Sequence, residues 1–190
     1  MELRKAILVC IRKAPEKATR TVVQKLLYLA VLKELTKAPY EAHYYGPYSS
    51  EVASLLEDLS SSGLIEETED TWQSFGSPWE IRRYRYSLPE GVDTALDSMT
   101  TKEDLIEARD LESIIETCER KGSLNPRSLS IAAKVLYILY ENNRPLTEAE
   151  IADEARKIGW KLTESEIQVT LVDLLAELGL VASKTDQTER

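Results

Sequence analysis

The chain has 190 residues, 43% of them hydrophobic, and a formal net charge of -9. It is long enough for one large globular domain or two small ones, and its acidic balance argues against a protein that coats nucleic acid through bulk electrostatic attraction. No apolar run approaches the roughly 20 residues that cross a bilayer, and the charged N-terminus lacks a signal-peptide core, so we expect a cytoplasmic protein with no membrane partner.

The first fifty residues predict two helices and a short strand. Apolar spacing indicates a helix over Leu3–Lys13. A second helix follows, capped by Thr21 or by Thr19, and it ends before Pro39. Weak alternation over residues 40–45 favours a short strand.

A turn, a helix and a hairpin come next, and together they predict the second half of a winged helix. Gly46 lies in the turn, where we expect a positive φ. The helix covers residues 50–62 and is stopped by Gly63, and the two strands cover 64–68 and 80–88. The exposed face of this helix is acidic, which makes it an unfavourable surface to offer to phosphates.

The remaining sequence predicts a connecting helix and a compact three-helix unit. The connecting helix runs from Thr100, which forms a capping box with Glu103, to Lys121. Asn125 and Pro126 suit the cap and first turn of the next helix. Two further capping boxes open the last two helices: Thr147 with Glu150, and Thr163 with Glu166.

An internal repeat relates the two halves of the chain. When Gly63 is laid on Gly179, apolar residues of both helices coincide: Leu55 with Leu171, Leu56 with Val172, Leu59 with Leu175, Leu64 with Leu180. Such helix endings also arise by chance, but the shared register favours a repeat. We therefore predict a mainly α fold with a small β-hairpin. Two winged-helix-like domains, 1–90 with a full wing and 125–190 with a reduced wing, are joined by a long helix within 91–124.

Two short motifs resemble those of a known group of proteins. The helix sequence Gln24, Lys25, Leu26, Leu27, Tyr28 and the later run Tyr44, Tyr45, Gly46, Pro47, Tyr48, Ser49 stand in the order seen in the Panacea (SocA-like) and YwgA-like proteins. The resemblance covers roughly residues 1–88. It implies a winged-helix-like fold, and some Panacea members act as antitoxins that bind a toxin partner. The second helical half lies outside the resemblance.

Five basic residues are the candidates for contact with DNA. Residues 1–50 hold nine lysines and arginines against four acids, a net charge of +5, which leaves -14 for the rest of the chain. The second strand of the hairpin adds three arginines. The candidates are Arg20, Lys25, Arg82, Arg83 and Arg85. A competing interpretation is that the strand arginines only protect a sheet edge from aggregation.

Four tyrosines within nine residues are candidates for a partner-binding surface: Tyr40, Tyr44, Tyr45 and Tyr48. Tyrosine offers a large contact area at a small entropic cost, so the cluster could bind a protein or stack on a base. The competing interpretation is that alternate tyrosines fill the space between the strand and the helices.

Catalytic and metal-binding patterns are absent from the sequence. His43 is the single histidine and has no neighbouring nucleophile in a motif, and no phosphate loop or dinucleotide fingerprint occurs. Cys10 and Cys118 lie on apolar helix stripes, where buried thiols are expected rather than a disulfide. We therefore expect neither catalytic residues nor a cofactor nor a metal site.

The sequence leaves two functions open. The leading hypothesis is a winged-helix regulator that binds double-stranded DNA, and the alternative is an antitoxin-like adaptor that binds a protein partner. We also expect a homodimer, because a stripe along the connecting helix lacks an obvious partner within the chain: Leu105, Ala108, Leu111, Ile115 and Cys118. The alternative is that this stripe packs back onto one of the two domains.

Overall fold

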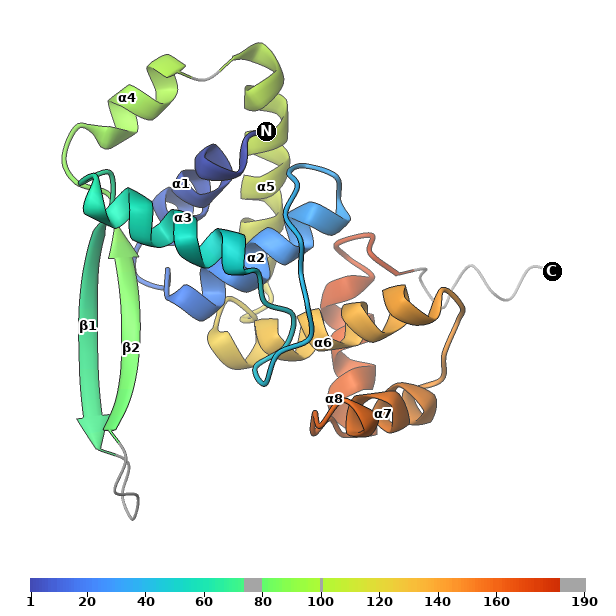
Figure 1. Cartoon of the computed structure of the whole chain (residues 1–190). Coiled ribbons are helices and arrows are strands. Elements are labelled where there is room, and N and C mark those ends of the chain that lie inside the picture. The colour runs from blue at the N-terminus through green and yellow to red at the C-terminus, as the bar shows by residue number, and fades with distance from the viewer. Residues whose placement is uncertain (74–79, 100, 182–190) are drawn as a thin grey trace.

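A computed structural model describes residues 1–73, 80–99 and 101–181 and shows a mainly helical protein with one small antiparallel sheet (Figure 1). In chain order the elements are α1 (Leu3–Lys13), α2 (Arg20–Leu32), α3 (Ser50–Ser61), β1 (Glu66–Gln73), β2 (Glu80–Ser87), α4 (Val92–Met99), α5 (Lys102–Arg120), α6 (Pro126–Asn142), α7 (Glu148–Lys157), α8 (Glu164–Val169) and the π-helix η1 (Thr170–Leu175). None of the helices in these described residues combines the length and the apolar character that crossing a bilayer requires.

The core of the first half forms around α2, which is buried along nearly all of its length. Helices α1, α3 and α5 pack around it or around one another, and Tyr86 of β2 closes the core from the hairpin side. The hydroxyl of Thr19 accepts a hydrogen bond from the Val22 amide at 3.2 Å, so Thr19, the second of the two expected caps, begins α2.

The hairpin pairs β1 with β2 over eight residue pairs, from Glu66 opposite Ser87 to Gln73 opposite Glu80. A further antiparallel bridge joins Thr19 to Arg85, and the Tyr86 amide donates to the Ala18 carbonyl at 2.9 Å. The segment before α2 therefore lies beside β2, joined to it by one isolated bridge, while the sheet itself has two strands.

The helix stops that the sequence predicts are present. Gly63 has a φ of 72°, and the Leu64 amide donates to the Leu59 carbonyl at 2.9 Å, which completes a Schellman motif after α3. Gly179 has a φ of 63°, and the Leu180 amide donates to the Leu175 carbonyl at 2.9 Å. The two ends of the proposed repeat thus share one backbone geometry, whereas the expected reduced wing over 182–190 lies outside the described residues.

Four sequence expectations are wrong in detail. The first strand of the hairpin, expected over 64–68, covers Glu66–Gln73 instead. Residues 40–45 form no strand; a single bridge joins Glu41 to Tyr48 instead, because this segment has no neighbouring strand to extend the pairing. The capping box of α5 belongs to Thr101 and Asp104, one residue later than predicted. A separate helix, α4, precedes α5 within the expected connecting segment.

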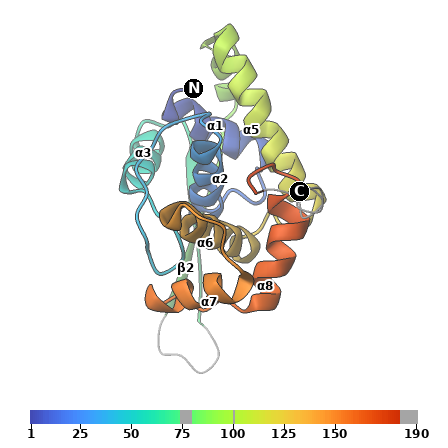
Figure 2. The ribbon, with the colours of Figure 1, turned by 90° about the vertical axis from the view of Figure 1, so that its right-hand side faces the viewer.

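The second half packs directly on the first. Helix α6 lies against α2, as Figure 2 shows, and α7, α8 and η1 cover its other side. The helix caps of the second half are as predicted: Asn125 caps α6, and the capping boxes of Thr147 and Thr163 begin α7 and α8. The buried side chains of both halves belong to one continuous cluster.

Most of the apolar stripe on α5 finds its partner within the chain. Ala108, Leu111, Ile115 and Cys118 are buried, and the helix packs against α1 and α2. Cys10 and Cys118 are both free, buried thiols, as expected. Leu105 stays 44% exposed, so the homodimer remains a prediction that rests on a much smaller surface.

Candidate functional site

The two motifs of the resemblance, on α2 and in the turn before α3, contact each other in the structure. The Gln24 side-chain amide donates to the Ser49 carbonyl at 2.8 Å and accepts from the Ser49 amide at 3.0 Å. The neighbouring Lys25 ammonium donates to the Pro47 carbonyl at 2.6 Å. The two motifs therefore form one structural unit, in which α2 fixes the path of the turn.

The second half of the chain holds the same turn from the opposite side. The Trp160 indole donates to the His43 carbonyl at 2.7 Å, and its ring meets that of Tyr137 edge-on, with centroids 5.6 Å apart. Gly46 has a φ of 102°, which confirms the expected positive value. A β-carbon at this position would lie 3.2 Å from Cγ of Lys134, so the turn is clamped between α2 and α6.

A groove of about 730 Å³ opens beside this turn. One wall comes from β2 and the start of α2, and the other from α6 and the segment leading into α8. In Figure 1 the hairpin lies on the side of the molecule where α6 begins, and the segment that joins α2 to α3 passes in front of α6. The groove thus uses both halves of the chain.

The lining of the groove is strongly basic. Its described residues include four basic side chains from the first half, Arg20, Lys25, Arg82 and Arg83, and three from the second, Arg127, Lys134 and Lys161. Glu166 is the one acid among the described lining residues. In a chain of net charge -9, this is a local reversal of sign.

Two of these lysines lie close enough to influence each other. Burial, together with the positive charge of Lys134, lowers the pKa of Lys25 to about 8. Burial also lowers the pKa of Lys134. Lys25 is 2% exposed, so its ammonium is held at the floor of the groove.

The arginines of the candidate DNA site already have partners. Arg20 donates to the Tyr86 hydroxyl at 3.0 Å and lies over the Tyr84 ring, 4.5 Å from its centroid. Arg82 lies 3.4 Å from Glu69, and Arg85 lies 2.7 Å from Asp70. Arg85 does not line the groove, and the acids of β1 neutralise part of the charge that β2 carries.

The four candidate tyrosines divide into two pairs. Tyr40 packs against Tyr28 at a centroid distance of 5.0 Å and donates to the Gln24 carbonyl, while Tyr48 is half-buried against His43. Tyr44 and Tyr45 are 74% and 63% exposed, and their rings meet edge-on at 4.9 Å. Tyr45 and Tyr48 also line the groove.

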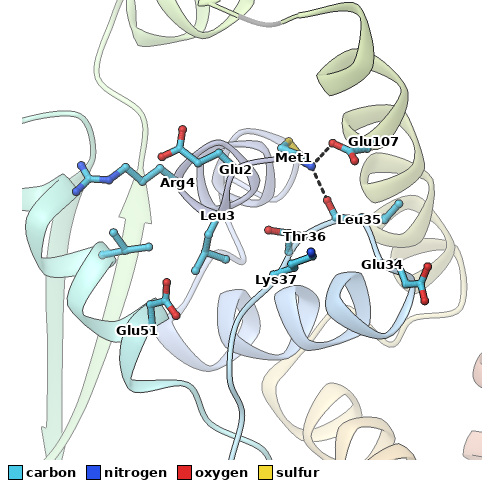
Figure 3. Close-up of a pocket in the computed structure, with 11 residues that line it drawn as sticks. Met1, Glu2, Leu3, Arg4, Glu34, Leu35, Thr36, Lys37, Glu51 and Glu107 are labelled. Carbon is cyan, nitrogen blue, oxygen red and sulfur yellow. Dashed lines mark hydrogen bonds and ion pairs between the residues drawn. The ribbon is translucent and has the colours of Figure 1, made fainter.

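A second cavity, of about 420 Å³, lies beside the start of α1, and Figure 3 shows acidic and basic side chains spread around it. The Met1 amino group donates to the Leu35 carbonyl at 2.9 Å and pairs with Glu107. Because the charges here are mixed, this cavity favours no class of ligand in the way the basic groove does.

Sequence reasoning missed the basic residues that the second half contributes to the groove, Arg127, Lys134 and Lys161. They are scattered over 35 positions in which basic and acidic residues are mixed, so no local pattern marks them. Among the described residues, no group of three or more histidines, cysteines or acids is arranged to hold a metal ion.

Comparison with known proteins gives one informative match. The chain is 27% identical over 119 residues to the uncharacterized protein YwgA of Bacillus subtilis (strain 168). The match covers 62% of this chain and 63% of YwgA, so the chain spans less than two thirds of that protein. No family model matches the chain. The similarity supports the YwgA-like part of the resemblance stated above.

Proposed function

We propose that this protein is a cytoplasmic DNA-binding regulator that holds the backbone of double-stranded DNA in the basic groove. The observation that carries the proposal is the charge of the groove: seven basic side chains against one acid among its described lining residues, in a chain of net charge -9. Phosphate contacts of this kind supply most of the affinity of DNA-binding proteins.

The order of elements supports a winged-helix-like first domain over residues 1–90. Helix α1, the strand segment at Thr19, helices α2 and α3, and the β1–β2 hairpin follow one another in the order that a winged helix requires. A second, shorter copy over 125–190 would consist of α6, α7, α8 and η1, with α8 and η1 in the place of α3. The departure from a simple helix-turn-helix is the long segment between α2 and α3, which docks on α6.

Helix α3 holds the position of the recognition helix in a winged helix, but its exposed surface is acidic. We therefore place the DNA contacts in the groove. Glu51, Glu57 and Asp58 are all exposed on α3 and would repel phosphates. The groove has the opposite sign and carries aromatic rings on which a sugar or base could rest. We therefore assign the main contacts to Arg20, Lys25, Arg82, Arg83, Arg127, Lys134 and Lys161.

The test is fluorescence anisotropy with random duplex DNA over a range of salt concentrations. Wild type should bind with an affinity that falls linearly on a logarithmic salt scale. Lys161→Gln, which removes an exposed lysine of the groove, should weaken binding and reduce the magnitude of that slope by about 0.9, the value for one lost phosphate contact. Lys102→Gln removes an exposed lysine from α5, outside the groove, and should leave the slope unchanged. Absence of salt-sensitive binding by wild type at micromolar protein would overturn the proposal.

A second candidate function, a protein-interaction adaptor of antitoxin-like type, is favoured by the exposed pair Tyr44 and Tyr45. Exposed aromatic rings held on a clamped turn lose little entropy on binding, so they suit a protein partner. The same anisotropy experiment separates the two candidates. The adaptor requires no DNA binding, so absence of salt-sensitive binding by wild type favours it. Tyr44 is not among the groove residues, so Tyr44→Ser should leave the affinity for DNA unchanged if the groove is the DNA site.

A further inference from the structure

Lys25 is an unusual buried cation. Its ammonium carries three hydrogen-bond donors, and its one hydrogen bond in the described part of the chain goes to the Pro47 carbonyl. Within those residues it forms no ion pair with a carboxylate, and it is only 2% exposed. Burying an unpaired charge is unfavourable, so such a group calls for a counter-ion from outside the chain.

Lys134 brings a second positive charge to the same place from the other half. The Lys25 and Lys134 side chains both approach Gly46: a β-carbon at that glycine would lie 3.5 Å from Cε of Lys25 and 3.2 Å from Cγ of Lys134. The Lys134 ammonium lies over the Trp160 ring at 5.5 Å and has no carboxylate partner among the described residues. Two cations held together without an acid between them repel each other until an anion joins them.

The nearest acid on the groove is already engaged. Glu166 accepts from Arg127 at 3.1 Å and from the Thr163 hydroxyl at 2.9 Å, in the capping box of α8. The hydrogen bonds from the Thr163 amide and hydroxyl, followed by the bond from Arg127, lower the pKa of Glu166, so it remains ionised and bound to its own partners. Its charge acts on Lys134 without forming an ion pair among the described residues, so it compensates the Lys25–Lys134 pair only in part.

We propose that Lys25 and Lys134 form an anion site at the floor of the groove that takes one phosphate group. A phosphate suits the site because it is anionic near neutral pH, with one negative charge in a backbone diester and about two in a free monoester, and because its oxygens accept hydrogen bonds from ammonium groups. The phosphate belongs either to a DNA backbone, in which case the inference deepens the proposed function and rests on it, or to a free phosphorylated molecule. Because one lysine comes from each half, occupancy of the site should stabilise the contact between α2 and α6.

Thermal unfolding of the full chain in inorganic phosphate tests the site. Sodium chloride keeps the ionic strength constant, so that only specific binding raises the melting temperature. Wild type should show a saturable rise in melting temperature, Lys134→Gln should show none, and Lys102→Gln should behave as wild type. If Lys134→Gln does not fold, calorimetric titration of wild type with phosphate replaces it. The absence of any saturable heat would overturn the site.

Competition between phosphate and duplex DNA then identifies the source of the phosphate. Stabilisation by phosphate together with displacement of DNA supports a backbone phosphate in the site. Stabilisation without any DNA binding supports the site as one for a free phosphorylated molecule and overturns the DNA-binding function. DNA binding that persists while phosphate neither stabilises nor competes overturns the anion site and leaves the DNA-binding function standing.

Discussion

Gly46 shows how one residue joins the two halves of the chain. Its φ of 102° lies outside the region that residues with a β-carbon adopt easily, and its surroundings leave little room for a side chain. Lys25 and Gln24 fix the turn from α2, and Lys134 and Trp160 close it from the second half. The glycine is therefore required both by its backbone conformation and by the close approach of α6.

We predict that Gly46→Val lowers the stability of the protein by at least about 1–2 kcal/mol, the typical strain of a positive φ, with a further loss from contact with Lys134. Gly122→Val is the matched control, because Gly122 also has a positive φ, of 65°, but has open space around its missing β-carbon. Thermal unfolding of both variants measures the difference. Equal melting temperatures would mean that the approach of α6 contributes nothing.

Lys25 should give stability a characteristic dependence on pH. Its folded pKa, about 8, lies below the ordinary value of 10.5, because of burial and the charge of Lys134. Between these values the unfolded chain binds more protons than the folded one, so stability rises with pH over this window. We predict that the stability of wild type relative to Lys25→Met increases from pH 7 to pH 10.

Urea unfolding of both proteins at several pH values measures this difference. Lys102→Met, on the exposed face of α5, controls for the loss of a lysine and should differ from wild type by a constant amount. A difference between wild type and Lys25→Met that stays constant with pH would show that Lys25 keeps its proton throughout.

At the scale of elements, ion pairs fasten α5 to α1. Lys5 lies 2.7 Å from Asp104, and Arg12 and Lys13 pair with Glu112 and Glu116 farther along α5. Asp104 also accepts from the Thr101 amide at 3.1 Å, so one carboxylate both caps the helix and holds its neighbour. Acids of α5 thus cover basic side chains of α1, whereas the α2 candidates Arg20 and Lys25 line the groove.

We predict that Asp104→Asn lowers the melting temperature at pH 7 more than Asp110→Asn, an exposed substitution on the same helix. The Lys5 hydrogen bond, followed by the bonds to Thr101, lowers the pKa of Asp104 to about 2 from an ordinary 3.8. Its stabilisation is therefore present above pH 4 and is lost as the pH falls through about 2. Melting curves from pH 7 to pH 2 should show the gap between wild type and Asp104→Asn closing, and a gap of constant size would contradict this role.

At the scale of the whole molecule, the arrangement of the halves decides which surfaces remain for other molecules. The apolar stripe of α5 is mostly used by α1 and α2, which leaves Leu105 and Ile106 exposed near the start of the helix, at 44% and 63%. These two side chains are the apolar surface of α5 that a second copy could cover.

We predict that, if the protein forms a homodimer through α5, light scattering at roughly tens of micromolar protein gives twice the chain mass of 21.5 kDa. Ile106→Glu would then return the mass to that of one chain, because burying an unpaired carboxylate in the contact destabilises the dimer. Lys102→Gln, one turn earlier on α5, is the control for a change of charge. A wild-type mass near 21.5 kDa at every concentration would rule out the dimer.

The sequence by itself determined the ends of most elements. Asn125, Thr147 and Thr163 cap their helices as predicted, and Gly63 stops α3, because caps and stops depend on side chains and backbone groups within a few residues. The same short range explains the one-residue error at Thr101, since Thr100 and Thr101 offer nearly the same local pattern.

Only the tertiary structure decided what the polar residues do. It buried Lys25 beside Lys134, paired Arg85 with Asp70, and brought Trp160 to the carbonyl of His43, 117 positions away. A charged residue has the same local signature whether it is solvated, paired across strands or buried beside a like charge. The difference lies in the distant residues that fold against it, and for the basic groove these come from both halves of the chain.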